Sequence, residues 1–238
     1  MNDSLEEAKA IFEWVTKRED ENPITVLVGG WAVYTYNPYY GSLDIDLVTN
    51  NRTKNSLQQY LIESRGYERR RDPLSGIKYI CKDFTTHGVV EIDFGSREGF
   101  NNFEGREEEL PLSLISDFTE FRSLERLKVP VPTRSFLLLM KMKAAWDRNW
   151  RLNNNRSRDP GWERGKLIKD YSDILALIDP KSGGATLDLN LLGSQINRLS
   201  FLKDVLERTI KSIDAAKKYE VSREYAGSII DGLTDLIF

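Results

Sequence analysis

The sequence predicts an α/β (α+β) fold in which a small mixed β-sheet is followed by a helical domain. Short apolar runs with many β-branched residues alternate with helix-like segments in the first half, and turn-forming Gly, Pro and Asn separate them. The second half instead repeats apolar residues at helical spacing. Because Pro130 and Pro132 interrupt regular structure, we place the boundary there, with domains at 1–131 and 132–238.

The elements of the first domain follow from these patterns in order. An amphipathic helix begins the chain, a buried strand ends at Gly29-Gly30, and the next short helix ends before Pro38. Strict alternation then indicates a strand, and Gly66 caps the helix that follows it. The expected elements are helix 4–17, strand 24–28, helix 31–37, strand 42–48, helix 53–64 and two paired strands at 76–83 and 88–95.

The second domain is expected to be helical, with helices over 135–150, over 166–179 and, as one or two helices, over 191–219. The Asn- and Arg-rich segment 151–165 is predicted to be an exposed loop. Between Lys141 and Asp170 there are nine basic and four acidic residues, an excess of five positive charges. This basic stretch favours contact with a polyanion, although the whole chain has a net charge of −3.

The composition excludes several kinds of site. A single cysteine, Cys81, excludes an internal disulfide, and with a single histidine, His87, there is no Cys/His zinc site. No run approaches the roughly 20 apolar residues that span a bilayer, and the acidic N-terminus does not resemble a signal peptide. We therefore expect a cytoplasmic protein without membrane contact, in which any metal ion is held by oxygen atoms.

Three acidic residues are candidate metal ligands. Asp44 and Asp46 are two positions apart on a predicted strand, so their side chains share one face, and Asp93 lies on another predicted strand. Carboxylates that converge without a cation repel one another, and Mg²⁺ binds such groups together with phosphate oxygens. The three residues therefore predict a site for one or two magnesium ions that supports phosphoryl displacement, with Asp93 near the attacking hydroxyl.

Gly29-Gly30 supplies a candidate phosphate site. Residues without a Cβ let backbone N–H groups approach a phosphate closely, and the helix that follows directs its positive end there. By itself such a pair is usually a turn, and Asp-x-Asp by itself is usually a polar strand face. Their order, with thirteen residues between Gly30 and Asp44 and the later Asp93, favours a phosphate cradle that faces a metal site.

This arrangement, over residues 24 to 95, resembles the DNA polymerase β-type nucleotidyltransferase superfamily, whose pattern is a strand, Gly-Gly or Gly-Ser, a helix, Asp-x-Asp and a later acid. The resemblance implies a nucleotidyltransferase domain over 1–131 that takes an NTP as substrate and Mg²⁺, or Mn²⁺, as cofactor. It implies that the catalytic metal ligands are Asp44, Asp46 and Asp93, and that Gly29, Gly30 and Ser42 contact the nucleotide.

Two branches of the superfamily share further residues with this chain. The segment GGWAV is similar to the start of aminoglycoside and lincosamide nucleotidyltransferases, whereas LLLMKMKAAWDR and KDYSDI resemble AbiEii-type toxins of toxin–antitoxin systems. The second likeness covers more of the chain. It implies that the nucleotide is also contacted by Lys78, Lys141, Arg148, Lys169 and Asp170. Many relatives have an Arg shortly before Asp-x-Asp, where this chain has Tyr40-Gly41-Ser42.

The identity of the acceptor is not fixed by these residues. An RNA, such as a tRNA end, or a protein fits the basic stretch and the toxin resemblance, which also implies a cognate antitoxin as partner. A cationic antibiotic would instead require an acidic site. Two functions without catalysis also compete: a relative that binds nucleotide or a partner without turnover, and a structural protein whose acids are incidental.

Overall fold

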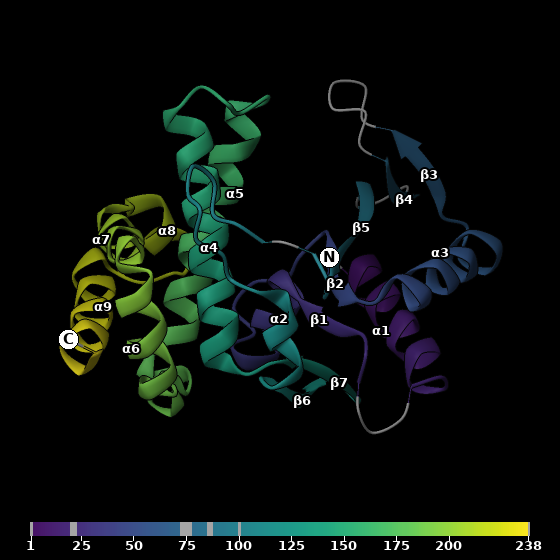
Figure 1. Cartoon of the computed structure of the whole chain (residues 1–238), viewed down its shortest axis with the longest axis horizontal. Helices are drawn as coiled ribbons and strands as arrows, with labels where there is room; N and C mark the ends of the chain where they lie inside the picture. The colour runs from purple at the N-terminus through teal and green to yellow at the C-terminus, as the bar shows by residue number, and fades with distance from the viewer. Residues whose placement is uncertain (1, 20–22, 72–77, 85–87, 100, 238) are drawn as a thin grey trace. The chain divides into compact units, whose positions relative to one another are not determined.

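The computed structural model describes residues 2–19, 23–71, 78–84, 88–99 and 101–237 (Figure 1). The chain divides into two compact units, of which the first comprises Met1–Phe100 and Pro111–Pro132 and the second Asn101–Leu110 and Thr133–Phe238. The first unit holds the strands, and the second is helical. This architecture confirms the predicted α/β (α+β) class with a small mixed sheet and a helical part.

A five-stranded sheet forms the centre of the first unit, with strand order β1-β2-β5-β4-β3. The strands β2 and β5 are parallel, and every other neighbouring pair is antiparallel, including the expected pairing of β4 with β5. The five strands are β1 (Val26–Val28), β2 (Ile45–Thr49), β3 (Glu68–Arg71), β4 (Lys78–Phe84) and β5 (Gly88–Ser96). The strand β3 is not predicted from the sequence, because Glu-Arg-Arg-Arg has no apolar alternation; its charges suit a sheet edge.

Two helices, α1 (Asn2–Thr16) and α3 (Asn51–Arg65), contact one face of this sheet (Figure 1). Lys82 of β4 pairs with Glu7 of α1, and Lys54 of α3 lies over the ring of Phe94 in β5. Asn50 caps the start of α3 by accepting a bond from the Thr53 amide, and Gly66 ends it at φ 74°, as expected. The helix α2 (Gly29–Tyr36) joins β1 to the segment before β2.

A separate two-stranded antiparallel sheet completes the first unit. It consists of β6 (Thr119–Leu124) and β7 (Leu127–Pro132). The strand β7 continues through Pro130 and Pro132, so the expectation that these prolines interrupt regular structure is wrong. The hydroxyl of Tyr36, at the end of α2, donates to the carbonyl of Pro132 over 2.7 Å. This bond attaches the end of β7 to α2.

The second unit is built on two long helices, α4 (Arg134–Asn153) and α5 (Pro160–Ile178). The predicted loop 151–165 is therefore too long, since Asp159 caps α5 by accepting a bond from the Trp162 amide and Pro160 occupies its first turn. The one or two helices expected over 191–219 are three in the described chain: α6 (Leu189–Arg198), α7 (Lys203–Lys211) and α8 (Ile213–Lys218). A further helix that was not expected, α9 (Arg223–Ile237), follows them. Among the described helices, none has the length and apolarity needed to cross a bilayer.

Candidate active site

The pairing of β2 with β5 brings two of the three predicted metal ligands side by side. Asp46 and Asp93 are register partners in these parallel strands, which places them about 4.8 Å apart across the ladder and on the same face. Ile45 and Leu47 point to the other face and are fully buried. The apolar alternation thus fixes the direction of both carboxylates, away from the face that α1 and α3 contact.

Asp44 lies outside the strand on which it was expected. The strand β2 begins at Ile45, and Asp44 is a half-buried residue in the bend before it. Ser42, the other predicted contact in this segment, is also half-buried and lies in irregular structure. The predicted strand 42–48 therefore begins three residues too early, and the direction of the Asp44 side chain is set by the bend instead of by a ladder.

Gly29 is held against the carboxylate of Asp46. The residue before it, Val28, is the register partner of Asp46 in the β1–β2 ladder, and Gly29 itself has φ +66°. A Cβ built on Gly29 would lie 1.8 Å from Oδ2 of Asp46, far inside van der Waals contact. Only glycine allows both this left-handed backbone and this close approach. The structure thus brings together Gly29, Asp46 and Asp93.

The first turn of α2 also lies beside the Asp46 carboxylate. The buried Gly30 follows Gly29 in the first turn of α2, and the residue at the N-cap is Val28, whose side chain has no acceptor for the amide groups of that turn. The amide groups at a helix start attract anions, because they lack partners within the helix and lie at the positive end of its dipole. This helix start is therefore suited to a phosphate beside Asp46.

The donor set can be compared with the needs of a divalent ion. Among the described residues, no three His, Cys, Asp or Glu side chains gather into one group that could hold a metal. Mg²⁺ nevertheless uses only one or two carboxylates and takes its other ligands from waters and substrate phosphates. Asp46 and Asp93 fit that requirement, and Asp44 is not gathered with them.

Replacing Gly29 by alanine tests this close approach. We expect Gly29→Ala to lower the free energy of unfolding by more than the ~1–2 kcal/mol of the left-handed backbone alone, because the new methyl group overlaps the Asp46 carboxylate. Gly66→Ala is the matched control, since Gly66 has φ +74° and nothing within 4 Å of its Cβ position. Urea unfolding of both variants measures the difference. Equal losses would show that Gly29 has no special contact with Asp46.

Four predicted nucleotide contacts, Lys141, Arg148, Lys169 and Asp170, lie in the second unit and form one ion network. Asp170 pairs with Arg148 of α4 at 2.8 Å and with Lys141 at 3.3 Å. Lys141 also pairs with Asp173 at 2.8 Å, and Asp173 pairs with Lys169 one helical turn before it. The network joins α4 to α5 within this unit.

Asp173 is the centre of this network and was not predicted as a site residue. Its side chain is 0% exposed, and burial alone would disfavour its charge. The ammonium groups of Lys141 and Lys169 outweigh that effect and hold the pKa of Asp173 below its ordinary value. The signal was present in the sequence, because Lys169 and Asp173 are at the i, i+4 spacing of a helical ion pair.

Several cations of the basic stretch between 141 and 170 pair with carboxylates within the second unit. Glu163 accepts ion pairs from both Arg148 and Arg151, and Glu104 adds a second partner for Arg151. Glu104 belongs to the segment 101–110, which no sequence pattern assigns to the helical part. Acidic partners are recorded for these basic residues of the stretch: Lys141, Lys143, Arg148, Arg151 and Lys169.

The remaining predicted contact, Lys78, is the first residue of β4, where its backbone pairs with Arg71. Its side chain lies outside the described part of the structure, so its predicted contact with phosphate stays a prediction.

The comparison with known proteins bears on the fold. The sequence matches no protein-family model and no curated protein. Among solved structures, the chain is similar to an antigenic nucleotidyltransferase-like protein from Paracoccidioides brasiliensis, with a TM-score of 0.51 and 16% sequence identity. The match covers 92% of this chain and 94% of that chain. The chain therefore has a nucleotidyltransferase-like fold over most of its length.

Proposed function

We propose that the protein is a metal-dependent nucleotidyltransferase, which transfers a nucleotidyl group from an NTP to a hydroxyl of an acceptor. The observation that carries this proposal is the juxtaposition of Gly29, Asp46 and Asp93, in which two carboxylates on neighbouring strands lie beside a glycine at a helix start. The similarity in fold to a nucleotidyltransferase-like protein supports it.

In this reaction the acceptor oxygen forms a bond to the α-phosphorus, the bond from that phosphorus to the bridging oxygen breaks, and pyrophosphate leaves. Asp46 and Asp93 would hold Mg²⁺ or Mn²⁺, which neutralises charge on the phosphates. The amide groups of Gly29 and Gly30 would orient the phosphate, and Asp93 would take the proton of the acceptor hydroxyl. Asp44 would join the metal ligands by turning in its bend.

The role of the second unit rests on the toxin resemblance. Lys141, Arg148 and Lys169 would contact the triphosphate, and their gathering in one network supports a shared role. Each already has a carboxylate partner, so the acids would hold the cations in place, with spare N–H donors for phosphate oxygens.

For the acceptor we propose RNA, such as a tRNA end, or a protein, with the enzyme acting as the toxin of a toxin–antitoxin pair. The test is incubation with each α-labelled NTP, Mg²⁺ or Mn²⁺, and a cell lysate, followed by ribonuclease or protease. Label lost to ribonuclease identifies RNA, and label lost to protease identifies protein. A separate reaction with aminoglycosides and lincosamides tests whether an antibiotic is the acceptor.

A second candidate is a relative that binds nucleotide without turnover. It is favoured by one observation, that the described side chains do not gather three acids into a metal-binding group. Nucleotide binding without label transfer from any of the four NTPs, to any acceptor in the lysate, would establish this candidate in place of the enzyme.

A further inference from the structure

A pocket lies on the face of the sheet opposite Asp46, entirely within the first unit. It has a volume of about 530 Å³, within the range of small-molecule sites. We call it the Lys54–Arg69 pocket; it is lined by Lys54, Gln58, Arg69, Tyr79, Ile80, Ile92, Asp93 and Phe94. Of these residues, only Asp93 is a site residue predicted from the sequence.

Strand register and helix spacing explain how this pocket is built. Arg69, Ile80 and Ile92 are successive register partners across β3, β4 and β5, so they form a row on one face. Phe94 follows Ile92 on that face, and α3 adds Lys54 and Gln58, which are one helical turn apart. The floor is therefore apolar, and α3 and β3 each contribute one cation, Lys54 and Arg69.

The two cations of the pocket differ from their neighbours in having no acidic partner among the residues that the structure describes. Arg70 pairs with Glu68 and Asp83, and Arg65 and Lys82 both pair with Glu7. In the described part of the chain, neither Lys54 nor Arg69 forms an ion pair, and Lys54 instead lies 5.6 Å from the centre of the Phe94 ring. Two uncompensated cations in one pocket attract an anion.

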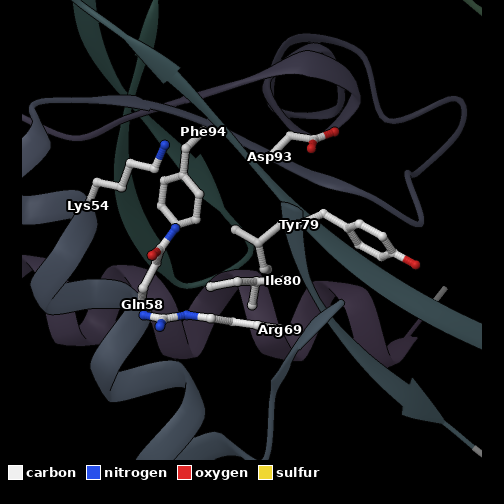
Figure 2. A pocket seen from close by; sticks show the side chains of 8 residues that line it. Lys54, Gln58, Arg69, Tyr79, Ile80, Asp93 and Phe94 are labelled. Carbon is white, nitrogen blue, oxygen red and sulfur yellow. The ribbon is translucent and has the colours of Figure 1, made fainter. Parts of the chain in front are cut away.

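Figure 2 shows the arrangement of these groups. The head groups of Lys54, Gln58 and Arg69 lie on the same side as the Phe94 ring, whereas the carboxylate of Asp93 points away from them. This direction follows from strand alternation, because Asp93 lies between Ile92 and Phe94 on β5. The acid among the lining residues therefore does not neutralise the two cations.

We propose that the Lys54–Arg69 pocket is a second nucleotide-binding site, distinct from the proposed active site and independent of metal. Lys54 and Arg69 would hold the phosphate through charge-assisted hydrogen bonds, and the base would stack on Phe94 after the flexible Lys54 stem moves toward the phosphate. The amide of Gln58 can both donate to and accept from the edge of a base. The nucleotide is either free or the phosphorylated end of an RNA.

The test is calorimetric titration in EDTA with AMP, GMP, CMP and UMP, and with 5′-phosphorylated RNA tetranucleotides. We expect one site for at least one nucleotide, competed by inorganic phosphate and absent for adenosine. Tighter binding of a tetranucleotide identifies an RNA end, and equal binding identifies a free nucleotide. Lys54→Gln/Arg69→Gln should weaken this binding by about 10-fold or more.

The control is Lys17→Gln/Arg126→Gln, which removes the same two charges at exposed positions elsewhere in the first unit. If the double variant unfolds more readily than the wild type, the test is repeated with Arg69→Gln alone, because Arg69 is exposed. Absence of binding, or equal affinity of the pocket and control variants, would overturn the proposal. Asp46→Asn should bind the nucleotide in EDTA as the wild type does. Loss of nucleotidyl transfer without loss of this binding would therefore contradict the proposed active site but not the second site.

Discussion

Asp46→Asn is expected to lower nucleotidyl transfer by about 100- to 1,000-fold, the loss that follows when metal-assisted charge stabilisation of several kcal/mol is removed. The structure makes Asp46 the central carboxylate, since it contacts the Gly29 position on one side and is the register partner of Asp93 on the other. The amide keeps the size of the side chain but not the charge that holds the cation.

A stability measurement distinguishes loss of the carboxylate from misfolding of the Asp46→Asn variant. Removing one of two adjacent carboxylates relieves repulsion, so Asp46→Asn should unfold at the same denaturant concentration as the wild type or a higher one. Glu98→Gln, which removes an exposed acid just after β5, is the control and should keep full transfer activity. Wild-type activity in Asp46→Asn would exclude this carboxylate from the reaction.

Asp173→Ala is expected to lower the free energy of unfolding by about 3–5 kcal/mol, because it leaves the ammonium groups of Lys141 and Lys169 buried without their shared partner. Glu207→Ala is the matched control. Glu207 also pairs with a lysine one helical turn away, Lys211, but its side chain is 65% exposed, so its loss should cost about 0.5 kcal/mol or less. Chemical unfolding of both variants measures the contrast.

The pH dependence gives a second measurement on Asp173. Its folded pKa lies below its ordinary value, so its contribution is complete above the unfolded pKa of about 3.9 and is lost as the pH falls through the folded pKa. The difference in unfolding free energy between wild type and Asp173→Ala should therefore shrink below about pH 4. Equal costs of Asp173→Ala and Glu207→Ala at pH 7 would show that the network does not stabilise the unit.

The strands that carry the site were predictable because burial fixes their alternation. Leu47 and Ile45 must face the core, so Asp46 faces away from it, and the same reasoning applies to Asp93. The register of β2 against β5 was not predictable, since it depends on how the sheet closes between distant segments. The contact between Gly29 and Asp46 follows from that register and from the positive φ of Gly29.

The sequence patterns did not predict the features that depend on charge instead of apolar spacing. The edge strand β3 has no apolar pattern, and so Arg69 was not connected with Lys54 on α3. In the second unit, the excess of basic residues suggested a surface for a polyanion. The acids that pair with them come partly from Glu104 and Asp173, which lie outside the counted stretch.

The reaction itself is tested most directly by comparing NTPs labelled at the α- or the γ-phosphorus, with Mg²⁺ and a cell lysate as the source of acceptors. We predict that α-label appears in an acceptor with release of unlabelled pyrophosphate, and that γ-label leaves entirely as pyrophosphate. Asp46→Asn should carry out both about 100- to 1,000-fold more slowly. Transfer of γ-label to the acceptor, or equal transfer of α-label by Asp46→Asn, would contradict a nucleotidyltransferase site built on Gly29, Asp46 and Asp93.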